Sequence, residues 1–350
     1  MSTDRLRYLF FVTKPYSFSI LEPIDKYINE SNNGETAWFT ASTALDIIPN
    51  GKLLKTSEEV MSYNPDAVLV PGNIVPSYWP GIKVQIFHGI DDEVKGFYDI
   101  TGQFDLYCTH SRKSTKRFKQ LAQKYKYFTV KETGWSKLDP LFTELNSKQQ
   151  SNQKLIKEFG FDSSKPILLY APTFPPKYTS ANELLGEITK LKDKYQWLVK
   201  FHTLMDEKIQ NKYRDLVSES FKIIDNNNII PYFEISDILI TDTSSVAYEF
   251  LPFDLPIITY KAIARKDKGI NLVEAKDLHG AITRSLLDPL EFSENRKFYL
   301  SEIHRYNDGK SSKRVIEVLN DSISENIFSK LKPKPQNWLR NRKIKKILQD

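Results

Sequence analysis

The chain has 350 residues, a length that suggests two domains, and its 40% hydrophobic and 13% aromatic residues are typical of a folded and not of a disordered chain. Its single cysteine, Cys108, excludes an intrachain disulfide framework and a cysteine-based zinc site, and fits a reducing cytoplasm. The formal net charge is +6, and much of this excess is local, because residues 330–348 hold eight Lys or Arg side chains and no acid.

The first half of the chain alternates apolar strands with helical segments. The N-terminus lacks the charged-then-apolar form of a signal peptide, and no apolar run approaches the ~20 residues of a membrane span. We therefore expect a cytoplasmic protein that attaches peripherally to the inner face of the cell membrane. The predicted strands are 8–12, 67–72, 83–87 and 104–109, and helices are predicted at 20–29 and after Ser111.

A polar segment at 146–153 predicts a connection between domains or the start of an exposed helix. Alternation then resumes, with strands predicted at 167–172, 197–202, 223–225, 229–230, 238–241 and 256–260 and helices at 182–195 and 311–323. We predict an N-terminal α/β domain at 1–148, a C-terminal α/β domain at 149–325 and a basic tail at 326–350. The alternation predicts two doubly wound, Rossmann-like parallel sheets, which bind ligands in a cleft at the carboxyl ends of their strands.

The most informative stretch is 238–250, where an apolar strand ends in Thr-Asp-Thr-Ser-Ser and passes into an apolar-periodic segment. Such a turn directs backbone N–H groups and the positive end of a helix dipole at one point, and Ser244 and Ser245 add hydroxyl donors. A phosphate or diphosphate is the ligand that fits. Capping of the helix by Asp242, Thr243 or Ser244 is the simpler alternative, and the two roles are compatible.

Two histidines follow apolar strands at matching positions, His88 in the first half and His202 in the second. An imidazole near its unperturbed pKa can take a proton from a hydroxyl at neutral pH. We expect one of the pair to act as a base and the other to bind charge; burial against backbone carbonyls is the alternative for either alone. His110 is expected to be structural or to contact an acceptor, and His279 and His304 are expected on the surface.

Three further residues are weaker candidates for ligand contacts. Thr173 follows Pro172 at a strand end, where it could bind a ligand or only turn the chain. Glu249 lies one helical turn after Ser245 and could accept the hydroxyls of a ribose, or lie on the helix surface. Arg314, near the start of a late helix, could clamp a phosphate or remain solvated.

The tail interleaves apolar residues, among them Trp338 and Leu339, with basic ones. This pattern predicts attachment to an anionic membrane surface, and a disordered basic tail is the alternative. Nucleic acid is not expected as a partner, because the body of the chain has no basic stripe with interleaved aromatic residues. No metal or other cofactor is expected, because the sequence lacks HExxH, P-loop, GxGxxG and carboxylate-rich metal motifs.

Taken along the chain, these motifs resemble the CDP-glycerol glycerophosphotransferase family, the polymerases and primases of teichoic acid and related cell-surface polymers. The family has Trp-His-Gly, Gly-x-Pro-Arg-x-Asp, Tyr-Ala-Pro-Thr-Trp, His-Pro, Thr-Asp-Tyr-Ser-Ser-Val, Lys-Pro-Val-Ile and Asp-Gly-x-Ala-x-x-Arg in this order. The corresponding elements here are Phe87 to Gly89, Gly134 to Asp139, Ile167 to Phe174, His202, Thr241 to Val246, Leu255 to Ile258 and Asp308 to Val315. This chain departs from the family motifs with Phe87 in place of Trp, Thr203 in place of Pro and Thr243 in place of Tyr, which indicates a divergent member.

The resemblance implies a GT-B-like fold, with two domains facing one another across a cleft and a CDP-glycerol or CDP-ribitol donor on the C-terminal domain. It implies that the donor diphosphate lies over Ser244 and Ser245 and near Arg314. His88 would deprotonate an acceptor hydroxyl, whose attack on the phosphorus expels CMP, and His202 would bind the phosphates. The acceptor would be a glycan or a lipid-linked polyol phosphate. The other expected substrate contacts are Gly89, Thr173, Asp242, Thr243 and Glu249.

Other enzymes share parts of this pattern. A ribitol-phosphate transferase, or a transferase acting on a capsule or lipopolysaccharide sugar, would look much the same. A GT-B glycosyltransferase or a UDP-sugar 2-epimerase-like enzyme, using a nucleotide sugar, is the main alternative, because it shares the fold and the diphosphate site. A non-catalytic binding protein of the same fold is a third.

Overall fold

The chain folds into two compact units. The structure, a computed structural model, describes residues 5–41, 51–89, 96–142, 145–175, 179–226 and 228–348. Unit 1 comprises Met1–Thr143 and Glu302–Asp350, and unit 2 comprises Glu144–Ser301. The chain therefore leaves unit 1 once and returns to it near its end.

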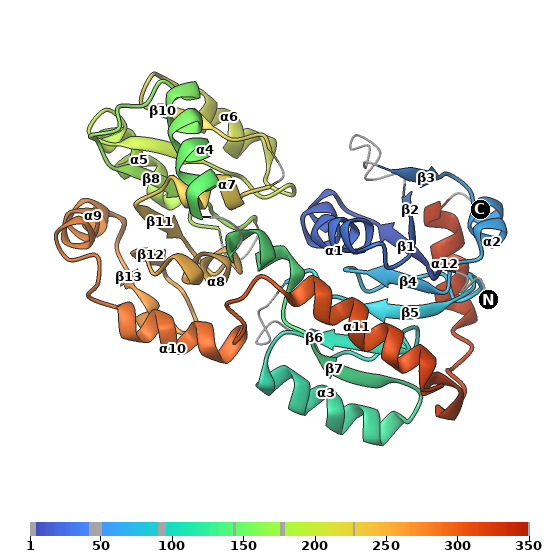
Figure 1. The fold of residues 1–350 in the computed structure, drawn as a ribbon. Coiled ribbons are helices and arrows are strands. Elements are labelled where there is room, and N and C mark those ends of the chain that lie inside the picture. Colours follow the sequence, from blue (N-terminus) through green and yellow to red (C-terminus); the bar gives the residue numbers. More distant parts are fainter. Residues whose placement is uncertain are drawn as a thin grey trace. The chain divides into compact units, whose positions relative to one another are not determined.

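Unit 1 is built on a parallel sheet whose described strands are ordered β3-β2-β1-β4-β5-β6-β7 (Figure 1). Residues 8–12 of β1 are fully buried, as expected for an apolar strand of a parallel sheet. The strand order reverses between β1 and β4, and doubly wound sheets bind ligands at such a switch point. The strands are β1 (Arg7–Val12), β2 (Glu35–Thr40), β3 (Lys52–Leu54), β4 (Ala67–Val70), β5 (Ile82–Gln85), β6 (Leu106–Thr109) and β7 (Thr129–Glu132).

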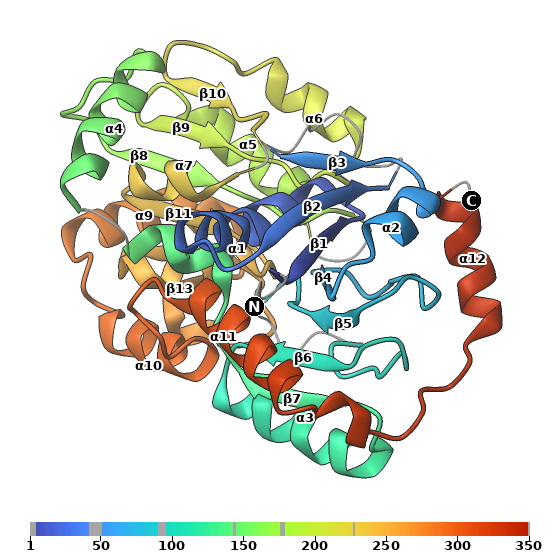
Figure 2. The same cartoon turned by 45° about the vertical axis from the view of Figure 1, so that its right-hand side comes forward.

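Helices from the beginning and the end of the chain pack together in unit 1 (Figure 2). The Tyr8 hydroxyl of β1 donates to Asn320 Oδ1 of α11 at 2.6 Å, which ties the late helix to the first strand. The α-helices are α1 (Phe18–Ser31), α2 (Ser57–Tyr63), α3 (Arg112–Tyr125), α11 (Ser311–Ser324) and α12 (Trp338–Leu348), and short 3-10 helices lie at Pro15–Ser17, Ser136–Phe142 and Phe328–Lys330.

The basic tail docks on unit 1. Lys334 Nζ lies 2.7 Å from Asp105 Oδ1, and Asn337 Nδ2 donates to the Thr101 carbonyl at 3.0 Å. In α12 the Ile344 side chain is buried, whereas Trp338 is 68% exposed. One face of this helix is therefore packed, and another presents an aromatic side chain to solvent.

Unit 2 carries a second parallel sheet, with the described strands ordered β10-β9-β8-β11-β12-β13 and a reversal between β8 and β11. The strands are β8 (Ile167–Tyr170), β9 (Gln196–Val199), β10 (Phe221–Ile223), β11 (Ile238–Thr241), β12 (Ile257–Tyr260) and β13 (Ile270–Leu272). The helices are α4 (Leu145–Glu158), α5 (Ala181–Leu191), α6 (Glu207–Arg214), α7 (Ile230–Glu234), α8 (Val246–Phe250), α9 (Leu278–Leu287) and α10 (Ser293–Ile303), with short 3-10 helices at Leu251–Phe253, Lys266–Lys268 and Ala275–Asp277.

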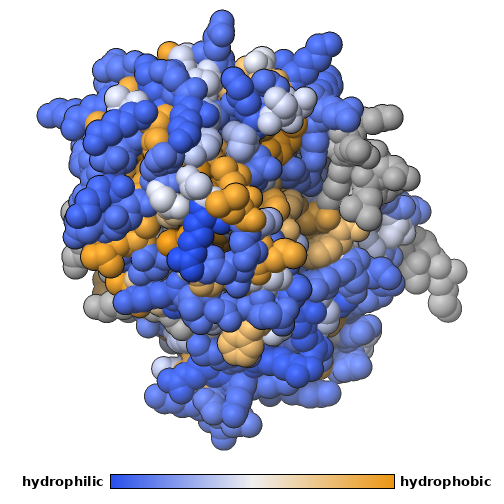
Figure 3. Space-filling view, turned by 90° about the vertical axis from the view of Figure 1, so that its left-hand side faces the viewer, coloured by the Kyte–Doolittle hydropathy of each residue, from blue (hydrophilic) through white to orange (hydrophobic). Residues whose placement is uncertain are grey.

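The surface is mostly hydrophilic, but on the face drawn in Figure 3 apolar side chains gather toward the middle. Among the described residues no helix combines the length and the apolar character that crossing a bilayer requires. Several large apolar side chains of unit 2 are exposed, namely Ile263, Val273, Leu287, Leu290 and Phe298.

The predicted strands are present except at 229–230, where Ile230 begins α7, and at 223–225, where β10 ends at Ile223 and shares only that residue with the prediction. The two units divide the chain differently from the predicted domains. Residues 302–325, which we placed with the C-terminal half, belong to unit 1 together with residues 326–350, and unit 2 begins at Glu144. The reason is that α11 packs against α1 and against the 3-10 helix at Ser136–Phe142.

A buried carboxylate holds α11 in unit 1. Asp139 accepts from the backbone N–H groups of Ser311 at 2.9 Å and Ser312 at 2.6 Å, at the N-terminus of the helix. Burial raises the pKa of Asp139, and these hydrogen bonds lower it. Gly134, at φ +80°, permits the close approach, because a Cβ there would come within 2.6 Å of Ser311 Oγ. Two sequence motifs about 170 residues apart thus meet.

We expect Asp139→Ala to lower the free energy of unfolding by about 2–4 kcal/mol, because it leaves two helix N–H groups buried without an acceptor. Asp321→Ala, on the exposed side of the same helix, is the matched control and should change it by less than about 0.5 kcal/mol. Urea denaturation followed by tryptophan fluorescence measures both. Equal stability of the two variants would contradict this role for Asp139.

Candidate functional site

In unit 1, His88 lies just beyond the end of β5, beside the switch point of the sheet. Phe87 adopts φ +66°, and its carbonyl accepts from Trp135 Nε1 at 3.1 Å, so that the chain turns sharply before His88. His88 Nδ1 lies 3.2 Å from the carbonyl oxygen of Pro71, which follows β4. The Tyr16 ring, from the 3-10 helix that follows β1, is centred 5.6 Å from the imidazole. The ends of β1, β4 and β5 therefore meet at this histidine.

The hydrogen bond to Pro71 decides the protonation of His88. A carbonyl oxygen can only accept, so Nδ1 carries the proton and the neutral ring has its lone pair on Nε2. Partial removal of the ring from water lowers the pKa of His88, and the hydrogen bond to the Pro71 carbonyl offsets part of this shift. The side chain nevertheless remains accessible to solvent. At Gly89 a Cβ would meet no atom of the described residues within 4 Å.

Two other histidines of unit 1 are buried. His110 Nε2 donates to the Ile86 carbonyl at 3.2 Å, and burial lowers the pKa of His110 to about 3. His304 is 1% exposed, so the expectation that it lies on the surface is wrong. The cause is tertiary: Gly134 is packed so closely that a Cβ there would lie 3.0 Å from His304 Nε2. Burial, followed by the charge of Arg314, lowers the pKa of His304 to about 4.

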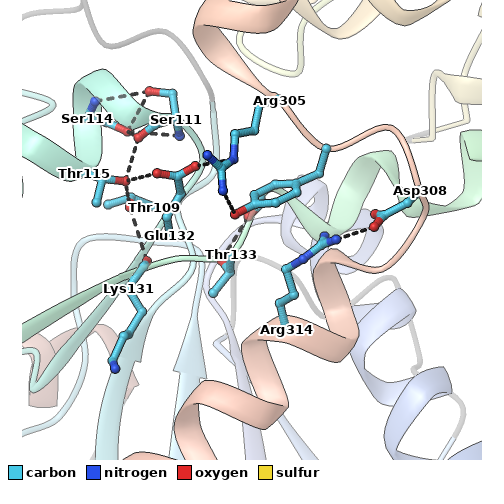
Figure 4. Close-up of polar contacts among 12 residues, drawn as sticks. Thr109, Ser111, Ser114, Thr115, Lys131, Glu132, Thr133, Arg305, Asp308 and Arg314 are labelled. Carbon is cyan, nitrogen blue, oxygen red and sulfur yellow. Dashed lines mark hydrogen bonds and ion pairs between the residues drawn. The ribbon is translucent and has the colours of Figure 1, made fainter.

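Arg314 belongs to unit 1, on α11, and has partners of its own there. Figure 4 shows its guanidinium directed at the Asp308 carboxylate, with which it forms an ion pair. The guanidinium also lies 3.8 Å from the centre of the Tyr306 ring. Its Nη1 is buried and has no hydrogen-bond partner among the described residues. Arg314 is thus held in place by Asp308 and Tyr306.

In unit 2, Asp242 follows β11 and braces the loop after β8. Its carboxylate accepts from the backbone N–H of Thr173 at 3.0 Å, and from the backbone N–H and the hydroxyl of Ser180 at 2.8 and 2.9 Å. Burial raises the pKa of Asp242 to about 6, although these hydrogen bonds favour the charged form. The Asp242 oxygens are therefore occupied by this loop, and the backbone N–H of Thr173 is likewise used.

His202 lies just beyond β9, where its ring packs against Phe174 with centroids 4.3 Å apart. Here the backbone N–H of Leu204 donates to His202 Nδ1 at 3.1 Å. Nδ1 must then be unprotonated, so the neutral ring carries its proton on Nε2, opposite to His88. Burial, followed by the charge of Lys200, lowers the pKa of His202 and keeps the ring neutral at pH 7.

The turn after Asp242 leaves Thr243, Ser244 and Ser245 partly exposed. Ser244 Oγ accepts from the Val246 N–H at 3.4 Å, a long contact. The following helix, α8, has only five residues, so its dipole is small and the donors are mainly local N–H and hydroxyl groups. Glu249 is 7% exposed, so it does not lie on the helix surface, which was one of the two expectations for it.

The structure brings Thr173 and Asp242 into direct contact. Phe174, the residue after Thr173, packs against the His202 ring. Ser244 and Ser245 follow the same strand as Asp242. His88, Gly89 and Arg314 belong to unit 1. Nothing in the described residues forms a group of three or more His, Cys, Asp or Glu side chains suited to a metal ion.

The sequence did not indicate several neighbours of the candidate residues. Tyr16, beside His88, and Phe174, beside His202, each follow a predicted strand, and that position is a signal that could have found them. Arg265 follows β12, and its guanidinium lies 5.0 Å from the centre of the Tyr248 ring on α8. Lys268 Nζ lies 5.7 Å from the same ring. Cations therefore accompany the helix that follows the Ser244-Ser245 turn.

Known structures share the fold. A variant of the wall teichoic acid polymerase TagF matches with a TM-score of 0.67 at 20% identity, over 93% of this chain and 90% of that one. UDP-GlcNAc 2-epimerase from Neisseria meningitidis, bound to UDP-GlcNAc, matches with a TM-score of 0.63 at 14% identity, over 90% and 100%. With two parallel-sheet α/β units, these matches confirm the predicted GT-B-like class.

Curated relatives are similar at the sequence level. A teichoic acid glycerol-phosphate primase of Bacillus subtilis (strain 168) is 26% identical over 66% of this chain and 61% of its own length. A teichoic acid poly(glycerol phosphate) polymerase of Bacillus spizizenii is 27% identical over 47% of this chain and 43% of its own length. The chain thus spans about half the length of these relatives. The family model described as CDP-Glycerol:Poly(glycerophosphate) glycerophosphotransferase matches residues 84–321, and the chain belongs to this family.

Proposed function

We propose that the chain transfers glycerol phosphate or ribitol phosphate from a CDP-alditol to a hydroxyl of a glycan or lipid-linked acceptor. The acceptor oxygen forms a bond to the phosphorus that bears the polyol, the bond from this phosphorus to the CMP oxygen breaks, and the acceptor proton passes to His88. The observation that carries the proposal is the opposite hydrogen bonding of two strand-end histidines, one with a free ring lone pair and one with a free N–H.

His88 suits the part of general base. Its Nδ1–H is used by the Pro71 carbonyl, which leaves Nε2 as an acceptor for the proton of a hydroxyl. The lowered pKa keeps the ring neutral at pH 7, as a base requires. Among the described residues, no atom lies within 4 Å of a Cβ placed at Gly89, which supports room for an acceptor chain beside the ring.

His202 suits the part of a phosphate ligand. Since its Nδ1 accepts from Leu204, the ring offers Nε2–H as a donor, and phosphate oxygens are acceptors. The partly exposed hydroxyls of Ser244 and Ser245 can add further donors to the same diphosphate, as can Thr243. Positioning and charge stabilisation of this kind account for most of the catalysis of phosphoryl transfer. Glu249 is assigned to the donor ribose and Arg314 to phosphate charge.

The exposed face of α12 is assigned to an anionic membrane surface. Trp338 and Leu339 are 68% and 61% exposed, and Arg342, Lys343 and Lys346 share the outward side. Apolar side chains among basic ones fit the boundary of an anionic leaflet. Attachment there, on the inner face of the cell membrane, would bring the enzyme to a lipid-linked acceptor.

A nucleotide-sugar enzyme is the second candidate, favoured by the fold that the chain shares with a UDP-GlcNAc 2-epimerase. The two candidates differ in the nucleotide of the donor.

We expect His88→Ala to reduce CMP release from CDP-glycerol in the presence of acceptor by about 100-fold or more, because the acceptor hydroxyl loses its base. His279→Ala, a histidine of unit 2 that contacts Lys194, is the control and should retain activity. Unchanged thermal midpoints would show that both variants fold. A fully active His88→Ala enzyme would contradict the role of His88 as the general base.

The pH profile gives a second prediction. A base works only when neutral, and a pKa lowered below the ordinary 6.5 keeps His88 neutral at more acidic pH. The midpoint of the acid limb of kcat/KM for the acceptor should therefore lie below pH 6.5. A limb at or above that value would show that the surroundings of His88 do not act as described.

A thermal-shift panel of CDP-glycerol, CDP-ribitol, UDP-sugars and GDP-sugars separates the two candidate functions, because a bound ligand stabilises the folded state. At a ligand concentration about 100 times Kd the gain is about 2.7 kcal/mol. We expect only CDP-alditols to raise the midpoint, and Ser244→Ala/Ser245→Ala to reduce the shift. Stabilisation by a UDP-sugar alone would favour the second candidate.

A further inference from the structure

Helix α3 of unit 1 is strongly basic. Residues 112–126 hold seven Lys or Arg side chains and no acid. Arg112, Lys116 and Lys119 are exposed, and no described carboxylate forms an ion pair with any of them. Such a concentration of unpaired charge of one sign attracts a polyanion.

An open groove of about 450 Å³ runs along this helix. Its lining includes Arg112, Lys116, Lys119, Gln120 and Gln123. Arg112, Lys116, Lys119 and Gln123 recur every three to four residues, with Gln120 beside Lys119, so they share one face over a length of about 16 Å at 1.5 Å per residue. Three cations are therefore followed by two amides along this face.

The acid of the groove is already neutralised. Glu132, on β7, lies 3.0 Å from Arg305 Nε and accepts from Thr115 Oγ1 at 3.2 Å, as Figure 4 shows. Its charge is thus opposed by Arg305, and the three cations of α3 remain available to a ligand.

The groove starts at the catalytic edge of the unit 1 sheet. Helix α3 begins at Arg112, two residues after His110, whose ring is hydrogen-bonded to the carbonyl of Ile86, two residues before His88. A molecule lying along α3 with one end at its first turn would therefore have that end near the strand ends where His88 lies.

We propose that the α3 groove binds a polyol-phosphate chain, the polymeric acceptor or product of the transfer, through its phosphodiester groups. Phosphodiesters would pair with Arg112, Lys116 and Lys119, and the amides of Gln120 and Gln123 would bond to polyol hydroxyls. The inference rests on the proposed function for the identity of the chain.

Two other polyanions fit the lining less well. A single-stranded nucleic acid needs aromatic platforms for its bases, and the lining contains no aromatic residue. A membrane surface is better served by apolar side chains among the cations, which α12 exposes and the groove lacks.

The test is equilibrium binding of a fluorescently labelled oligo(glycerol phosphate), long enough to span α3, measured by anisotropy without donor. We expect Lys116→Glu/Lys119→Glu to weaken binding by about tenfold or more, because two cation contacts become repulsive. Lys154→Glu/Lys157→Glu, on α4 of unit 2, makes the same charge change at the same spacing and should stay within about twofold of the unchanged protein. Unaltered thermal midpoints establish that all variants are folded.

Equal effects of the two double variants, or no effect of either, would overturn the inference. The inference would also be overturned if binding of an oligonucleotide of equal charge, or of vesicles containing phosphatidylglycerol, depended on Lys116 and Lys119 while binding of the oligo(glycerol phosphate) did not. The outcome is separable from that of the proposed function, because binding is measured without turnover. Polymer binding through α3 without CMP release would refute the transferase proposal and support the groove as a polymer site. CMP release without polymer binding would refute the groove proposal and support the transferase.

Discussion

The buried carboxylate of Asp242 is the interaction on which the candidate site of unit 2 depends. It follows β11 and accepts from Thr173 and Ser180, which begin and end the loop between β8 and α5. This loop also carries Phe174, whose ring packs on His202. The ends of β8, β9 and β11 are therefore fixed relative to one another at the point where the strand order reverses. Asp139 plays a comparable part in unit 1, where it fixes the start of α11.

The two units use the same sheet topology but give their histidines different chemistry. In unit 1 a backbone carbonyl accepts from Nδ1 of His88, and in unit 2 a backbone N–H donates to Nδ1 of His202. A neutral imidazole has one donor and one acceptor, so each backbone contact decides the character of the opposite ring nitrogen. One ring is left able to take a proton and the other able to hold an anion, as transfer between a hydroxyl and a phosphate requires.

The sequence predicted the central strands and the class of fold, because runs such as Tyr8 to Val12 and Ile238 to Thr241 are continuously apolar. It missed β2, β3, β7 and β13, which are short or carry polar residues, as in the Thr-Val-Lys-Glu of β7. It also identified the strand-end histidines and the turn after β11. It could not show that His304 is buried or that residues 302–325 join unit 1, since both depend on contacts with Gly134 and Asp139, far away in the chain.

Backbone hydrogen bonds at Nδ1 make His88 an acceptor and His202 a donor at Nε2. Two-dimensional ¹⁵N–¹H correlation spectra of protein labelled at histidine, assigned with His88→Ala and His202→Ala, report the tautomer of each ring directly. At neutral pH we predict a protonated Nδ1 for His88 and a protonated Nε2 for His202. The same tautomer at both positions, or an imidazolium at His88, would contradict the account.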